Sequence, residues 1–102
     1  MIQGIILAAG RGSRLGHLTE YKPKSFNKSG NKRYIDINID NFNNNNINKL
    51  NIIVGYKKNL FKNFPYKKIF NQQWKSSNIF YSLSRANKIL KLNTCIVSYA
   101  DI

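Results

Sequence analysis

The feature that most constrains this fold is a short apolar run that ends in a glycine-rich stretch. The run Ile2 to Leu7 has the length and composition of a buried strand, and residues 7–24 that follow read LAAGRGSRLGHLTEYKPK. The sequence therefore places a glycine-rich turn at the carboxyl end of a strand, followed by two cations, Arg14 and Lys24. Backbone N–H groups exposed by glycines, together with fixed cations, are suited to hold a polyphosphate.

Other interpretations of this stretch fit the residues less well. A P-loop needs glycine directly before its lysine, but Pro23 stands there. The dinucleotide fingerprint needs a third glycine where Leu15 stands, although Asp36 lies about 20 residues further on, where a ribose-binding acid is expected. If Gly10 and Gly12 only form a tight turn, the two cations that follow are left unexplained. The sequence therefore favours a polyphosphate-binding loop of a different kind.

The net charge of +13 gives a second hypothesis, a nucleic-acid-binding module without catalysis. The 17 basic residues are scattered along the chain, with short clusters only at Lys57-Lys58 and Lys67-Lys68. Zinc-finger spacing, an RRM core and a heptad repeat are all absent from the sequence. A solvated, lysine-rich surface is the favoured interpretation, and nucleic acid is not the expected partner.

Cysteine content and hydropathy indicate the cellular compartment that is expected for this protein. The single cysteine, Cys95, allows no disulfide within the chain, which suits a reducing environment. The sequence has no apolar stretch of about 18 residues and no long apolar core of a signal peptide at its start. We therefore expect a cytoplasmic protein without a membrane span.

The apolar runs alternate with helical patterns, which predicts an α/β fold. Strands are expected at 2–7, 50–54, 67–70 and 94–99, and helices at 34–46, 57–64 and from 76–78 to about 91. The segment 34–46 fits either period, but joining two parallel strands requires a crossover, which favours helix. This series predicts a Rossmann-like, doubly wound parallel sheet with strand order 3-2-1-4 and helices on both faces, as one domain over residues 1–102.

That strand order makes two distant segments converge. In a doubly wound sheet, ligands bind at the carboxyl ends of the strands, where the strand order reverses. The loop 10–24 leaves the first strand there, and Asp101 follows the fourth. Because Mg²⁺ is commonly bound by one or two carboxylates together with phosphate oxygens, we predict Asp101 as a magnesium ligand, the alternative being an ordinary surface acid.

The loop resembles the signature of the nucleotidyltransferases that activate sugar phosphates and phosphocholine. The matching pattern is Leu-Ala-Ala-Gly-x-Gly-Ser-Arg-Leu, then Leu-Thr, then Pro-Lys, with His17 and Phe26 as two departures from the frequent residues. Two further segments are more similar to the phosphocholine cytidylyltransferase branch: residues 74–86, with Asn78 and Tyr81-Ser82-Leu83, and residues 98–102, with Tyr99-Ala-Asp-Ile102. The matched segments correspond only to the N-terminal part of a family member.

The resemblance implies a magnesium-dependent transfer of a nucleotidyl group from a nucleoside triphosphate, CTP being favoured, with release of pyrophosphate. It implies Arg14 and Lys24 as catalytic residues and Asp101 as the metal ligand. Nucleotide binding is implied for the remaining matched positions, which are Leu7, Ala8, Ala9, Gly10, Gly12, Ser13, Asn78 and Ser82. For the last two residues, helix capping by Asn78 and packing by Ser82 remain open alternatives.

The acceptor implied first is phosphocholine or a similar small phosphorylated molecule, and the alternative is a sugar 1-phosphate. We expect an incomplete nucleotidyltransferase fold, from a truncated or partial chain that does not catalyse by itself. The fourth strand is expected to lie at a sheet edge with unpaired backbone groups. Self-association through that edge is therefore a further expectation.

Overall fold

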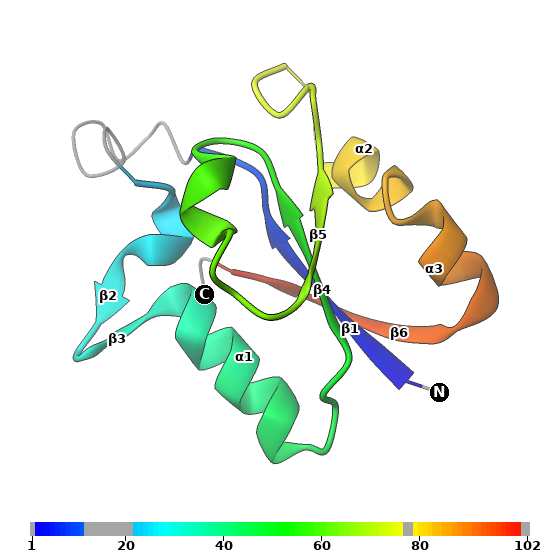
Figure 1. Ribbon diagram of the computed structural model, residues 1–102, viewed down its shortest axis with the longest axis horizontal. Coiled ribbons are helices and arrows are strands. Elements are labelled where there is room, and N and C mark those ends of the chain that lie inside the picture. Colours follow the sequence, from blue (N-terminus) through cyan, green and yellow to red (C-terminus); the bar gives the residue numbers. More distant parts are fainter. Residues whose placement is uncertain (1, 12–21, 77–78, 101–102) are drawn as a thin grey trace.

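A four-stranded parallel sheet forms the centre of the protein (Figure 1). The computed structural model describes residues 2–11, 22–76 and 79–100, and the structural statements below concern these residues. The strands lie in the order β5-β4-β1-β6, and every neighbouring pair is parallel. Their bounds are β1 Ile2–Ala8, β4 Leu50–Val54, β5 Lys67–Phe70 and β6 Thr94–Tyr99. Counted along the chain, these four strands have the predicted order 3-2-1-4, so the predicted α/β class and topology are confirmed.

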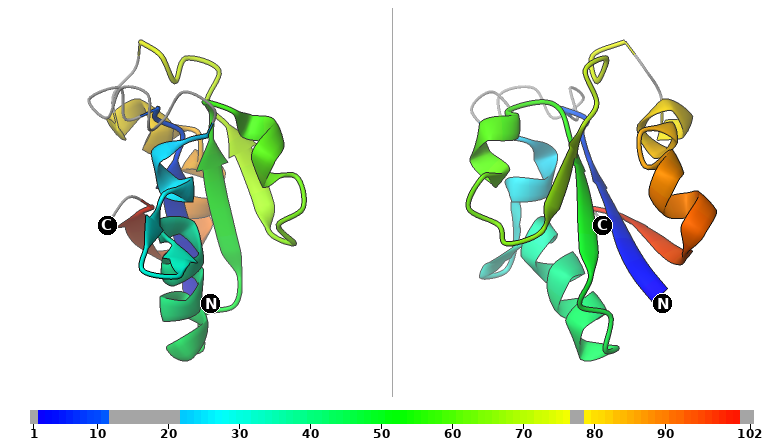
Figure 2. Two further views of the ribbon diagram at one scale, coloured as in Figure 1. Left: turned by 90° about the vertical axis from the view of Figure 1, so that its left-hand side faces the viewer. Right: turned by 45° about the vertical axis from the view of Figure 1, so that its right-hand side comes forward.

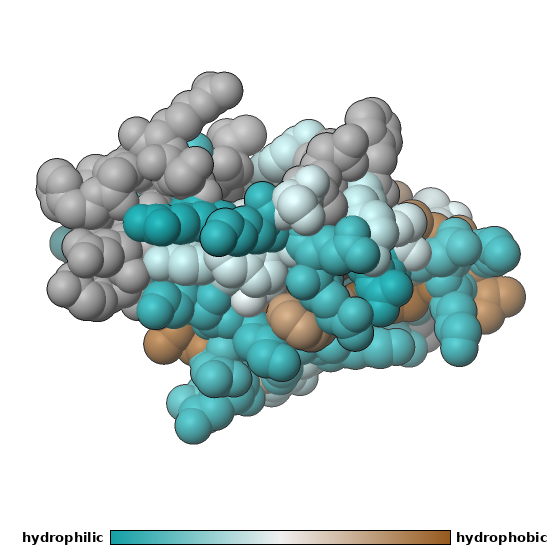
Figure 3. All heavy atoms as spheres, turned by 90° about the horizontal axis from the view of Figure 1, so that it is seen from above, coloured by the Kyte–Doolittle hydropathy of each residue, from teal (hydrophilic) through white to brown (hydrophobic). Residues whose placement is uncertain are grey.

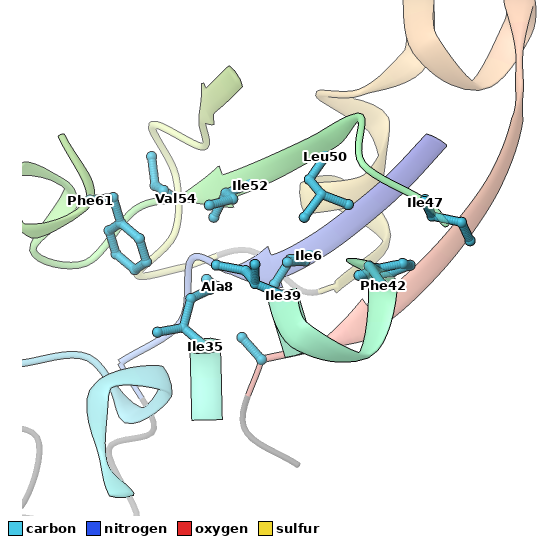
Figure 4. Close-up of a cluster of buried hydrophobic side chains, with 11 residues drawn as sticks. Ile6, Ala8, Ile35, Ile39, Phe42, Ile47, Leu50, Ile52, Val54 and Phe61 are labelled. Carbon is cyan, nitrogen blue, oxygen red and sulfur yellow. The ribbon is translucent and has the colours of Figure 1, made fainter. Parts of the chain in front are cut away.

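Helix α1 (Tyr34–Asn44) covers one face of the sheet and forms the larger core with it. Ile35, Ile39 and Phe42 recur at helical spacing and are all buried. Figure 4 shows these three side chains directed toward Ile6 of β1 and Ile52 of β4. The helix that the crossover requirement favoured is thus confirmed, and its apolar residues form one buried face. The helix ends at Asn44, within the asparagine run 43–46 where its end was expected, and Asn46 then adopts a left-handed φ of 61°.

Two short helices, α2 (Ile79–Ser84) and α3 (Asn87–Leu92), cover the opposite face (Figure 2). The sequence predicted one helix here, and this prediction was wrong. The hydroxyl of Ser84 donates a hydrogen bond of 2.6 Å to the carbonyl of Tyr81, and such local bonds compete with a continuing helix. Ala86, at the break, is 1% exposed and packs against Ile5 and Ile53 of the sheet.

Smaller elements fill the connections. After β1, the chain forms the 3-10 helix η2 (Lys24–Phe26) and a two-stranded antiparallel hairpin of β2 (Lys28–Ser29) and β3 (Lys32–Arg33). The hairpin was not predicted, because its strands have only two residues each. In place of the predicted helix at 57–64, a 3-10 helix η3 (Lys58–Phe61) follows β4. Within the part of the chain that the structure describes, no helix is long and apolar enough to cross a membrane.

Candidate nucleotide-binding site

The segments that follow β1, β4 and β6 meet at the carboxyl edge of the sheet. The backbone N–H of Ala100, directly after β6, donates a hydrogen bond of 3.1 Å to the carbonyl of Leu7 near the end of β1. The backbone N–H of Tyr56, after β4, donates one of 2.8 Å to the carbonyl of Ala9. Backbone hydrogen bonds therefore fix the start of the glycine-rich loop on both sides. Viewed from this end, the described surface is largely hydrophilic (Figure 3).

The predicted nucleotide-binding residues at the end of β1 differ in what they can offer a ligand. Ala8 and Ala9 are each 5% exposed, and their side chains belong to the cores on opposite faces of the sheet. Leu7 is partly buried against the same core as Ala9. A nucleotide at this edge would therefore meet mainly the backbone of these three residues.

Gly10 is exposed, and its environment is open. A Cβ atom added there would meet no other atom within 4 Å. Gly55 is the opposite case, because a Cβ there would lie 2.4 Å from Cβ of Trp74 and 2.8 Å from the carbonyl oxygen of Ala9. Packing thus explains the glycine at position 55 and leaves the glycine at position 10 without a structural reason inside the described chain.

Aromatic rings hold the cation that follows Gly10. The guanidinium of Arg11 lies 5.4 Å from the ring centre of Tyr56, and that ring is 5.1 Å from the ring of Trp74. The ammonium of Lys57 approaches the Tyr56 ring from 5.7 Å. Interactions of this type attract a cation through the ring quadrupole. The sequence alone gave no role to Tyr56 or Trp74, because their neighbours along the chain do not show that Tyr56 faces Arg11.

Lys24, a predicted catalytic residue, begins η2 and is partly buried. The preceding residue, Pro23, is also buried, and its carbonyl accepts a hydrogen bond of 2.9 Å from the N–H of Phe26. The carbonyl of Lys24 accepts a hydrogen bond of 3.0 Å from the N–H of Asn27. The backbone that carries Lys24 is therefore a closed turn.

Ser82, the predicted residue on α2, is buried and bonded to another side chain. The side-chain amide of Asn71 donates a hydrogen bond of 2.8 Å to the Ser82 hydroxyl. Asn71 is 1% exposed, and its amide oxygen accepts from the N–H of Gln73 at 2.9 Å. This geometry matches the packing alternative for Ser82, with Asn71 joining the end of β5 to α2. Asn71 was missed in the sequence, where its only signal is a polar residue directly after a strand.

The other predicted site residues lie outside the described residues. They are Gly12, Ser13 and Arg14 of the loop, Asn78 before α2, and Asp101 after β6. Ala100, which precedes Asp101, is described and is 1% exposed. Among the described residues, no group of three or more histidine, cysteine or acidic side chains could hold a metal ion. The magnesium prediction therefore rests on Asp101.

Comparison with known proteins identifies the family. The family model described as "Nucleotidyl transferase" matches residues 3–97. This chain belongs to the nucleotidyl transferase family. The family resemblance recognised in the sequence is thereby confirmed.

Two curated relatives of this nucleotidyl transferase chain carry a cytidylyltransferase name. The choline-phosphate cytidylyltransferase of Streptococcus pneumoniae is 37% identical over 86 residues, which cover 80% of this chain and 38% of the relative. The CTP:phosphoglutamine cytidylyltransferase of Campylobacter jejuni is 32% identical over 111 aligned positions, which cover 99% of this chain and 44% of the relative.

A solved structure agrees with these matches. The structure of CTP:phosphocholine cytidylyltransferase from S. pneumoniae has a TM-score of 0.88 and 36% identity, over 98% of this chain and 45% of that one. This chain therefore spans less than half the length of the relatives that it matches.

Proposed function

We propose that this chain supplies the nucleotide-binding part of a cytidylyltransferase, which transfers the CMP group of CTP to a small phosphorylated acceptor. The observation that carries the proposal is the hydrogen bond between Ala100 and Leu7. It brings the segment that leads into Asp101 beside the segment that leads into the glycine-rich loop. Under this proposal, the carboxylate of Asp101 would act beside the phosphates that the glycine-rich loop binds. The names of the two curated relatives support CTP as the nucleotide.

The proposed reaction needs positioning and charge neutralisation, without a covalent intermediate. An oxygen of the acceptor phosphate attacks the α-phosphorus of CTP, the bond from that phosphorus to the bridging oxygen breaks, and pyrophosphate leaves. The backbone N–H groups of Gly10 and Gly12 would hold the phosphates. Lys24 would bridge the α-phosphate and the acceptor phosphate, and Arg14 would neutralise the pyrophosphate. Asp101 would hold Mg²⁺, which would supply further charge neutralisation.

Phosphocholine is the acceptor that we propose first. Two observations support this acceptor. One is the name of the S. pneumoniae relative, and the other is the resemblance of segments 74–86 and 98–102 to the phosphocholine cytidylyltransferase branch. The name of the C. jejuni relative shows that the acceptor differs between relatives of similar identity. Because this chain is not expected to catalyse by itself, calorimetry that compares the binding of phosphocholine and of a sugar 1-phosphate in the presence of CTP tests this choice.

Nucleotide binding tests the proposal most directly. Isothermal titration calorimetry should show tighter binding of CTP with Mg²⁺ than of CMP, because only CTP carries the β- and γ-phosphates. Arg14→Ala should weaken CTP binding about ten- to a hundredfold, which corresponds to about 1.5–3 kcal/mol for a charge-assisted hydrogen bond. Arg85→Ala removes the same charge from an exposed side chain between α2 and α3 and should leave the affinity unchanged. Equal affinities for CTP and CMP, unaltered in Arg14→Ala, would contradict the proposal.

A further inference from the structure

The 3-10 helix that carries Lys24 is anchored through the ring of Phe26. This ring packs edge-on against Phe61, with ring centres 4.9 Å apart and an angle of 70° between the planes. A second edge-on contact joins it to Phe64 at 6.1 Å and 73°. Phe61 is fully buried in the core on the α1 face of the sheet.

Arg33 lies over the same ring. Its guanidinium carbon is 4.6 Å from the ring centre of Phe26 and 5.4 Å from that of Phe64. Asp36, in the first turn of α1, accepts hydrogen bonds from Nε of Arg33 at 2.6 Å and from Nη2 at 3.1 Å. Both side chains of this pair are about one-third exposed. A planar guanidinium can be bonded at its edge and stacked on its face at the same time, which a lysine ammonium cannot do.

Backbone hydrogen bonds continue from this pair to Lys24. The N–H of Tyr34, the residue after Arg33, donates to the carbonyl of Asn27 at 2.9 Å. The N–H of Asn27 in turn donates to the carbonyl of Lys24 at 3.0 Å. The turn that carries Lys24 is thus connected to the start of α1 twice, through the backbone and through the ring of Phe26. A shift of Arg33 would act on both connections.

We infer that Arg33 is a positioning residue for Lys24. The two hydrogen bonds to Asp36 hold the guanidinium over Phe26, and Phe26 fixes η2 so that the ammonium of Lys24 meets the α-phosphate of the bound nucleotide. The inference rests on the proposed function of Lys24 in binding CTP. Arg33 itself needs no contact with the nucleotide.

A double-mutant cycle on CTP binding tests this coupling. In the parent chain, Arg33→Gln should weaken the binding of CTP with Mg²⁺ about five- to tenfold, because groups in one network show interaction energies that correspond to such factors. In the Lys24→Ala background, the same substitution should change the affinity less than about twofold, since the group that it positions is gone. Circular dichroism of each variant checks that the fold is retained.

Lys32→Gln is the matched control. Lys32 is the neighbour of Arg33 in β3, and it forms an ion pair with Asp40 of α1, the helix that also carries Asp36. This pair is more exposed, and within the described chain it is Arg33, not Lys32, whose charge lies over the ring of Phe26. The control removes the same charge from the same hairpin, so it should alter CTP binding less than about twofold in either background. An equal loss in control and test variants would show a general charge effect and overturn the inference.

Two further variants separate positioning from charge and from folding. Arg33→Lys keeps the charge but loses the paired hydrogen bonds, so it should bind CTP nearly as weakly as Arg33→Gln, and full rescue would overturn the inference. If Arg33→Gln does not fold, Phe26→Leu takes its place, because leucine keeps the apolar contact and removes the ring face.

The outcome for Lys24→Ala alone separates the two proposals. If Lys24→Ala weakens CTP binding and the Arg33 effect is the same in both backgrounds, the proposed function stands and the positioning role is wrong. If Lys24→Ala leaves CTP binding unchanged, the role of Lys24 fails, and the positioning role fails with it.

Discussion

Gly10→Ala should separate ligand binding from stability at the first turn of the loop. The added methyl group meets no atom within 4 Å, and Gly10 is not among the described residues with a positive φ. The free energy of unfolding should therefore change by less than about 0.5 kcal/mol, as for other surface substitutions. If the backbone at this position approaches a phosphate, the methyl group obstructs it. The loss of one hydrogen bond to a charged group then costs about 1.5–3 kcal/mol, or a ten- to hundredfold weaker affinity for CTP.

Gly55→Ala is the control with the opposite expectation. Its methyl group would lie 2.4 Å from Cβ of Trp74 and 2.8 Å from the backbone carbonyl of Ala9, atoms that cannot move without a backbone shift. Overpacking of this kind costs about 1–3 kcal/mol, which lowers the Tm of a domain of this size by roughly 4–20 °C.

Thermal denaturation followed by circular dichroism measures the stabilities, and calorimetry with CTP and Mg²⁺ measures the affinities. The reasoning for Gly10 is refuted if Gly10→Ala folds with the parent Tm and binds CTP as tightly as the parent. A Gly10→Ala variant as unstable as Gly55→Ala would also refute it, because open space at that position would then be wrong.

Two other predictions concern the edge of the sheet that β6 forms. Asp101→Asn keeps the shape of the side chain and removes its charge, so the magnesium dependence of CTP binding should fall while the Tm is retained; a variant that titrates with Mg²⁺ like the parent would show that Asp101 is not a ligand. Ile96 is 47% exposed on β6, and the only neighbour of β6 among the described strands is β1. Ile96→Lys should therefore reduce self-association, measured by sedimentation velocity. The control Leu60→Lys, at a residue 43% exposed on η3, should leave self-association unchanged. Monomers at all concentrations of the parent chain would contradict the second prediction.

The sheet could be predicted from the sequence because its signals are local and its order follows a rule. All five residues of β4 are buried and four of them are apolar, so this strand can be recognised from its own residues. Once four such runs alternate with crossovers, a doubly wound sheet allows few orders. The convergence of the segments after β1 and β6 then follows from the order alone, and the hydrogen bond from Ala100 to Leu7 agrees with it.

Sequence patterns did not reveal the contacts that determine the role of a single side chain. Ser82 could pack or bind a nucleotide as far as its own neighbourhood shows, and its partner Asn71 lies on another element. Asp36 stands at the spacing of a ribose-binding acid, yet it bonds to Arg33 three residues before it. The break between α2 and α3 depends on the hydrogen bond of Ser84 and on the packing of Ala86 against the sheet.

Aromatic rings near the carboxyl edge allow this chain to hold its cations while leaving their charge in place. The whole chain has only four acidic residues against 17 basic ones, so most cations cannot have a carboxylate partner. Arg11 lies over the ring of Tyr56, and the ammonium of Lys58 lies 4.0 Å from the ring centre of Phe70. A ring attracts a cation through its quadrupole but carries no net charge, whereas a carboxylate would cancel the field at a distance. Cations held in this way would still attract the nucleoside triphosphate of the proposed function, and because exposed charges are screened by salt, that attraction should weaken as ionic strength rises.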